Sequence, residues 1–186
     1  MIKILNTGVS DQTISKSRFV AVAQYCDYEN DAISFLRNQA KEHKTATHLA
    51  YAYRILTEDG IAQRFSDAGE PSGTAGKPIL QLIEGRDLIN LCVCVIRYYG
   101  GINLGTGGLS RAYGGTAKAA IENAQTGPYV KMAEIAFEVD YKMFDGFIRD
   151  VLLLKGTILN KSFNNRITVT VLLPEIELPN LISKYN

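Results

Sequence analysis

An apolar run of six residues, Leu91–Ile96 (LCVCVI), lies near the middle of the chain. Its valines and isoleucine favour a β-strand, and a strand without polar positions is typical of one that is buried on both faces. The fold must therefore place a layer of structure on each side of this strand. Two glycine-dense segments flank it, FSDAGEPSGTAGKPIL (65–80) before it and GGINLGTGGLSRAYGG (100–115) after it.

Segments of strand and helix character alternate through the first two thirds of the chain. The expected strands are 17–26, 48–56 and 88–99, and the expected helices are 28–43, 79–83 and 116–124. In the first helix, Ile33, Leu36 and Ala40 recur at helical spacing. Asn30 or Asp31 is a suitable cap for its start. This order predicts an α+β or α/β layered domain.

Gly127-Pro128 cannot continue a helix, and we expect a domain boundary there, giving domains 1–126 and 127–186. The second domain should contain a strand, a helix, a hairpin turning at Asn164-Asn165 and a last helix near Pro179. The expected elements are strand 131–141, helix 142–156, strands 157–163 and 166–174, and helix 175–186. This order resembles a split βαββαβ sheet that lacks its final strand.

The overall composition limits the partners of the chain. A formal net charge of +1 argues against a strongly basic nucleic-acid binder, although a local basic patch is compatible with it. The three cysteines are an odd number, so we expect reduced, buried thiols and a cytoplasmic protein. No apolar run has the length of a membrane span, and we expect no signal peptide and no membrane partner.

Neither glycine-dense segment matches a nucleotide-binding motif. If Gly76-Lys77 ended a P-loop, Pro71 would replace the first glycine and Pro78 the magnesium-binding hydroxyl. In the second segment, Ser110 stands where a dinucleotide fingerprint needs glycine or alanine. Both readings are therefore rejected.

Two interpretations of the glycines remain open. Gly73–Gly76 and Gly105–Gly108 each precede or begin a helix, where backbone N–H groups bind anions. Arginine and lysine nearby suit phosphate, and tyrosines could stack bases; these are Arg64, Lys77, Arg97, Arg111, Tyr98, Tyr99 and Tyr113. In the alternative interpretation, the glycines only allow tight turns and close packing.

Support for catalysis is weaker. Asp67 and Glu70 could form a paired-carboxylate site, or they could cap backbone N–H groups ahead of a helix. His48 and His43 each stand alone in the sequence, and Ser72 lacks the nucleophile-elbow pattern. We therefore expect no catalytic residue, no metal site and no cofactor.

The segments ATHLAYAYRI, FSDAGEPSGTAGKPIL and VIRYYGGINLGTGGLSRAYGG, in this order, closely resemble the Impact/YigZ family. The resemblance extends over nearly the whole chain. It implies an α+β protein with a first domain like domain 2 of ribosomal protein S5. The second domain would be ferredoxin-like, similar to a late domain of elongation factor G, here without its last strand. It also implies a role around translation, without the additional RWD domain and the partner which that domain binds.

The resemblance further implies a binding cleft. Its residues would be His48, Arg64, Asp67, Glu70, Pro71, Ser72, Gly73, Thr74, Arg97, Tyr98, Gly100, Gly101, Gly105, Gly107, Gly108 and Arg111. Leu49-Ala50 departs from the more polar residues of many relatives. The leading hypothesis is an RNA- or ribosome-associated protein that acts in the regulation of translation. The alternatives are an enzyme or binding protein for a nucleotide or other phosphorylated small molecule at the Asp67–Glu70 cleft, and a peptide-binding module.

Overall fold

The structure is a computed structural model that describes residues 1–185, so Asn186, the end of the expected second domain, lies outside the described residues. The chain forms two compact units, Met1–Tyr129 and Val130–Asn186. Strand β7 (Thr126–Pro128) pairs with β1 (Ile2–Ile4), so these residues belong to the first unit. The boundary thus falls three residues after the one expected from Gly127-Pro128, because the glycine and proline lie in a short paired strand.

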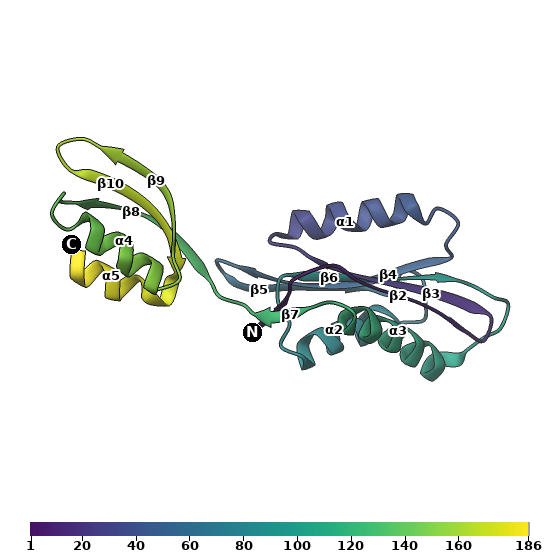
Figure 1. Cartoon of the computed structure of the whole chain (residues 1–186). Helices are drawn as coiled ribbons and strands as arrows, with labels where there is room; N and C mark the ends of the chain where they lie inside the picture. The colour runs from purple at the N-terminus through teal and green to yellow at the C-terminus, as the bar shows by residue number, and fades with distance from the viewer. Residues whose placement is uncertain (186) are drawn as a thin grey trace. The chain divides into compact units, whose positions relative to one another are not determined.

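The first unit contains a five-stranded sheet in the order β2-β3-β6-β4-β5, antiparallel throughout (Figure 1). The strands are β2 (Gly8–Ile14), β3 (Ser17–Tyr25), β4 (His48–Thr57), β5 (Gly60–Ser66) and β6 (Leu91–Tyr98). The apolar run forms β6 in the centre, as the sequence predicts. Its neighbouring strands β3 and β4 run antiparallel to it, and helices on both faces of the sheet bury it.

Helix α1 (Glu29–Glu42) covers one face of this sheet, and helices α2 (Gly76–Gly85) and α3 (Gly105–Glu122) cover the other (Figure 1). The buried side of α1 is formed by Ala32, Phe35, Leu36 and Gln39, so only Leu36 of the predicted face is part of it. Its N-cap is Tyr28. Asp31, in the first turn, accepts hydrogen bonds from the backbone N–H groups of residues 27 and 28.

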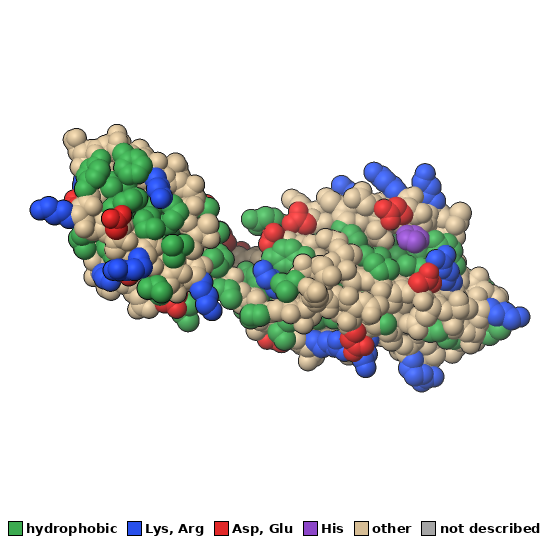
Figure 2. Space-filling model, viewed as in Figure 1, with side chains coloured by type: hydrophobic (Ala, Val, Ile, Leu, Met, Phe, Trp, Pro, Cys, Tyr) green, Lys and Arg blue, Asp and Glu red, His purple; other side chains and the backbone are tan. Residues whose placement is uncertain are grey.

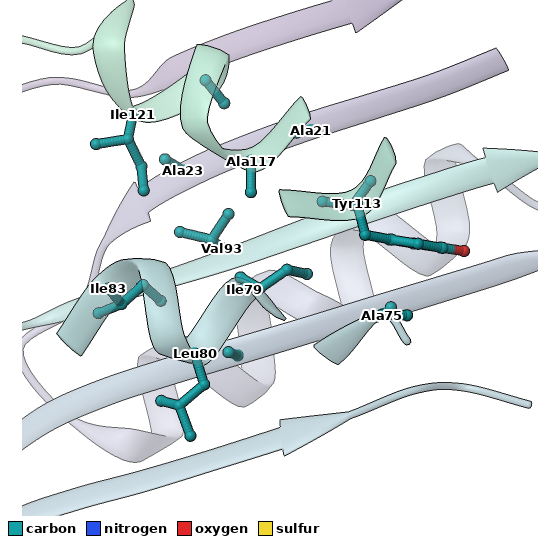
Figure 3. Packing of buried hydrophobic residues seen from close by; sticks show 14 of the residues in the cluster. Ala21, Ala23, Ala75, Ile79, Leu80, Ile83, Val93, Tyr113, Ala117 and Ile121 are labelled. Atoms are coloured by element: carbon teal, nitrogen blue, oxygen red, sulfur yellow. The ribbon is translucent and has the colours of Figure 1, made fainter. Parts of the chain in front are cut away.

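The main core fills the space between the sheet and helices α2 and α3. Figure 3 shows Ile79 and Ile83 of α2 and Ala117 of α3 packed over the sheet residues Ala23 and Val93. Small residues on the strands let both helices approach the sheet closely, and burying each large apolar side chain contributes about 1.5–3 kcal/mol. The chain segments that enter α2 and α3 are therefore fixed on one face of a rigid sheet.

The second unit has a three-stranded antiparallel sheet, β8-β10-β9, and two helices. Its elements are β8 (Met132–Val139), α4 (Phe144–Leu153), β9 (Thr157–Phe163), β10 (Ile167–Pro174), a 3-10 turn (Glu175–Glu177) and α5 (Leu178–Tyr185). The order of elements is the predicted one. Its described residues form three strands.

The three cysteines are free and buried, and Cys92 and Cys94 point to the α1 face of β6. Burial raises the pKa of Cys26 and of Cys94 to about 12. These thiols are therefore core side chains, as predicted. Among the described residues, no helix is both long and apolar enough to cross a lipid bilayer.

Candidate functional site

A cavity of about 530 Å³ opens on the α2/α3 side of the first unit. It lies where the ends of β4 and β6 meet the loop before α2 and the start of α3. Five of the predicted cleft residues line it: His48, Glu70, Pro71, Arg97 and Gly105. Tyr99, predicted to stack bases, also lines it, and the remaining lining residues are Thr47, Asn103, Leu104, Thr106 and Leu109.

Glu70 is the centre of a buried polar cluster on one wall. Its Oε1 accepts hydrogen bonds from Nη1 of Arg97 at 2.7 Å and from the hydroxyl of Tyr113 at 2.8 Å. The side chains of Glu70 and Arg97 are 4% and 5% exposed, so this ion pair is almost completely withdrawn from water. Burial, and then the hydrogen bond to Glu70, raise the pKa of Tyr113, which therefore remains a hydrogen-bond donor.

His48 lies beside this cluster in a single tautomer. Its Nδ1 is 2.8 Å from the carbonyl oxygen of Ala68, which can only accept, so Nδ1 carries the hydrogen. The backbone of Ala68 has a φ of 49°, an uncommon value for a residue with a Cβ, and this turn directs its carbonyl to the ring. Nε2 lies 3.8 Å from Oε1 of Glu70. In the neutral ring, Nε2 is therefore an acceptor next to the carboxylate.

The first turn of α3 forms another wall. Its first backbone N–H groups have no carbonyl partner within the helix, and no side chain caps them among the described residues. Gly105, the first residue of the helix, has a φ of 67°, which glycine adopts without steric cost. Gly105 and Thr106 line the cavity, so unpaired amides and the positive end of the helix dipole meet this space.

Arg97 and Tyr99 connect these walls. The guanidinium of Arg97 lies 5.1 Å from the centre of the Tyr99 ring, and its buried Nε has no hydrogen-bond partner among the residues that the structure describes. Tyr99 is 46% exposed, and its hydroxyl donates to Asn103. An aromatic ring with an exposed surface is thus held at the mouth of the cavity.

Asp67 has a structural role outside the cavity. Its carboxylate accepts hydrogen bonds from the backbone N–H groups of Gly73, Ala75 and Gly76, at 2.8, 3.0 and 2.8 Å. Burial alone would raise the pKa of Asp67, but the hydrogen bonds from these backbone groups and from that of Lys77 outweigh it and lower the pKa. Asp67 and Glu70 therefore do not form a paired-carboxylate site, because Asp67 caps the start of α2.

Two of the glycines are needed for packing. A Cβ on Gly76 would lie 2.4 Å from the carbonyl oxygen of Ser66, and one on Gly100 would lie 2.0 Å from that of Lys16. Both distances are far below normal contact. For these two positions the architectural interpretation of the glycines is therefore correct, whereas a Cβ on Gly105 would meet no atom within 4 Å.

The structure does not bring all the predicted cleft residues together. Arg64 of β5 lies directly opposite Tyr53 of β4, so its side chain is on the α1 face of the sheet, as that of Tyr53 is. Tyr98 is also on this face, where its hydroxyl forms a hydrogen bond with Nδ1 of His43. Including them was wrong, because successive strand residues point to opposite faces. Tyr113 is buried and cannot stack a base.

The other predicted residues lie around the cavity without lining it. Gly108 and Arg111 line a neighbouring hollow of about 400 Å³ that shares Asn103 and Leu104 with the first. The remaining ones, Ser72, Gly73, Thr74, Gly101 and Gly107, belong to the adjoining loops and the first turn of α3. In the described chain, no three His, Cys, Asp or Glu side chains are grouped so that they could hold a metal ion.

Comparisons with known proteins agree with the sequence motifs. The Impact N-terminal domain matches residues 15–121. An Impact family member from Thermus thermophilus is 46% identical over 128 residues, which cover 69% of this chain and 68% of the relative. The Impact family member YigZ of Escherichia coli K12 is 33% identical over 174 residues, covering 93% and 85%.

A solved structure, described as the crystal structure of a hypothetical protein, has a similar fold. It aligns with a TM-score of 0.72 at 31% sequence identity and covers 98% of this chain and 89% of its own. Because the alignment includes both units, the two-domain α+β architecture is shared with that protein. The family match spans both glycine-dense segments and the cavity between them. This chain therefore belongs to the Impact family.

Proposed function

We propose that this protein associates with RNA or the ribosome in the regulation of translation, and that its cavity holds one phosphate-bearing nucleotide unit. The observation that carries the proposal is the uncapped start of α3 at Gly105 and Thr106, facing a cavity that Tyr99 also lines. Helix starts of this kind bind phosphate. Membership of the Impact family supports the connection with translation.

In this proposal, each wall of the cavity contacts a different part of the nucleotide unit. The phosphate accepts hydrogen bonds from the amides at the start of α3, and the base stacks on the exposed surface of Tyr99. Arg97 is neutralised by Glu70, so it positions Tyr99 and is not counted as a free phosphate-binding charge. A cavity of about 530 Å³ accommodates one such unit.

The surface charge supports modest affinity. Figure 2 shows Lys and Arg side chains scattered over the visible face of the first unit among acidic ones, without a continuous basic surface. We therefore expect the protein to neutralise only one or two phosphates of a bound RNA. Affinity for single-stranded RNA should fall only about threefold to sevenfold when the salt concentration rises fourfold.

The test is a titration of fluorescently labelled single-stranded RNA at low and moderate salt. Tyr99→Ala should weaken binding about 5- to 150-fold, since stacking contributes about 1–3 kcal/mol per base. Tyr141→Ala is the matched control, because Tyr141 is a 56% exposed tyrosine of the second unit whose hydroxyl also makes one hydrogen bond. Equal affinities of wild type and Tyr99→Ala would contradict the proposal.

A second candidate function is the binding of a free nucleotide or sugar phosphate. The dimensions of the cavity favour it, because pockets for small molecules have volumes of about 300–1,000 Å³. A thermal-shift screen with nucleotides and sugar phosphates tests it, since a ligand that binds the native state raises the melting temperature. No shift with any compound would reject this candidate.

A further inference from the structure

Glu70 and His48 both line the cavity and carry hydrogen-bond acceptors. Both donors that reach Glu70, from Arg97 and from Tyr113, bind the same oxygen, Oε1. Its other oxygen, Oε2, receives neither of these hydrogen bonds, and the side chain as a whole is only 4% exposed. An ionised carboxylate can accept at both oxygens. Glu70 therefore has acceptor capacity left for a group inside the cavity.

His48 provides the second acceptor. Because Nδ1 donates its hydrogen to the carbonyl of Ala68, Nε2 of the neutral ring can only accept. Nε2 is 3.8 Å from Oε1 of Glu70, and both residues line the same cavity. With a neutral His48 ring, a ligand that fills this space satisfies both acceptors if it supplies two neighbouring O–H or N–H donors, and an acceptor that it leaves buried without a partner is costly.

We infer that His48 and Glu70 recognise the ribose hydroxyls of the bound nucleotide unit, so that the cavity selects ribonucleotides over deoxyribonucleotides. Adjacent hydroxyls on one ribose supply the required pair of donors, and acidic side chains bind ribose hydroxyls in dinucleotide-binding folds. The 2′-hydroxyl is the group by which proteins distinguish RNA from DNA. This inference rests on the proposed function, because it requires a nucleotide unit in the cavity.

The first test uses the unmodified full chain. Isothermal titration compares AMP with 2′-deoxy-AMP, and a fluorescence titration compares a short RNA with the DNA of the same sequence. We expect the ribose form to bind about tenfold tighter or more in each pair, because the deoxy form leaves one acceptor unpaired. A preference with AMP alone assigns a free nucleotide as the ligand, and a preference with the oligonucleotide assigns RNA.

Two variants then assign the preference to these side chains. Glu70→Gln keeps a carbonyl oxygen for Arg97 but puts an amide donor beside it, and His48→Phe keeps a ring next to Gly69 without the acceptor. Each should reduce the ribose preference to less than about threefold, with residual binding of both forms. If Glu70→Gln does not fold, the loss of the ribose preference in His48→Phe alone tests the assignment.

The outcomes separate this inference from the proposed function. Equal binding of ribose and deoxyribose forms overturns the inference and leaves the proposed function standing. Binding of neither form overturns both. A ribose preference that persists in the folded variants overturns the assignment to His48 and Glu70.

Discussion

Nη1 of Arg97 donates to Oε1 of Glu70 at 2.7 Å beneath the candidate cleft, with both side chains almost completely buried. The two residues come from the central strand and from the loop before α2, 27 positions apart in the chain. This ion pair therefore fastens the first glycine-dense segment to the sheet and places His48, Glu70 and the start of α3 around one cavity.

Removing the carboxylate of Glu70 should destabilise the protein strongly. In Glu70→Ala the buried Arg97 loses its counter-charge, and the free energy of unfolding should fall by about 3–5 kcal/mol. Urea denaturation followed by circular dichroism measures this. Glu58→Ala, at an exposed position, should change the value by less than about 0.5 kcal/mol. Similar stabilities of the two variants would show that the Glu70–Arg97 pair does not hold the loop.

Asp67 should make stability depend on pH. The folded-state pKa of Asp67 lies below its ordinary value of 3.8, so its stabilisation is complete above that value and is lost as the pH falls toward the folded-state pKa. At neutral pH, Asp67→Ala should lower the free energy of unfolding by about 1–3 kcal/mol, because three backbone N–H groups lose their acceptor. Urea denaturation should show this difference narrowing below about pH 4. A difference that does not vary with pH would contradict the capping role.

Substitution by alanine should lower the stability of the protein at Gly76 and raise it at Gly115. A Cβ on Gly76 would lie 2.4 Å from the carbonyl oxygen of Ser66, so Gly76→Ala must displace the backbone and should lower the melting temperature by several degrees, corresponding to about 1–3 kcal/mol. Gly115 lies in an exposed part of α3 with no atom within 4 Å of its would-be Cβ. Gly115→Ala should raise stability by about 0.5–1 kcal/mol. Thermal unfolding of both variants measures these changes. An unchanged melting temperature in Gly76→Ala would be inconsistent with the observed packing.

The cysteines should be inert in the folded protein. Burial raises the pKa of all three thiols, so almost no thiolate forms near neutral pH, and their side chains are at most 1% exposed. A thiol reagent such as Ellman's reagent should label none of them in native buffer and all of them in denaturant. Rapid labelling of even one thiol in native buffer would show that the α1 side of the sheet opens.

Local sequence patterns were enough to predict most of the elements. The continuous apolar run of β6, the hairpin at Asn164-Asn165 and the order of elements in the second unit are all observed. Strands β2 and β5 were not predicted, because they lie at the two edges of the sheet and carry many polar residues. Their strand conformation depends on pairing with β3 and β4, which local composition does not encode.

The arrangement of the site required the tertiary structure. Arg64 and Tyr98 have the chemistry of a phosphate or base site, but strand register turns them to the α1 face. Thr47, Asn103 and Thr106 lie within the quoted family motifs but were not named as cleft residues, and they line the cavity because β4, β6 and α3 converge there. Their spacing in the sequence suggested that Asp67 and Glu70 could act as a pair. In the structure, Asp67 accepts hydrogen bonds from three backbone amides, whereas Glu70 binds Arg97.

Nucleotide binding at the start of α3 is tested most directly by a nuclear magnetic resonance titration of ¹⁵N-labelled protein with AMP. We expect the largest shifts at the backbone amides of Gly105 and Thr106 and near Tyr99, because phosphate accepts hydrogen bonds from the start of α3 and the base stacks on the ring. Little change should occur on α1, on the opposite face of the sheet. Shifts centred on α1, or none at millimolar AMP, would contradict nucleotide binding in the cavity.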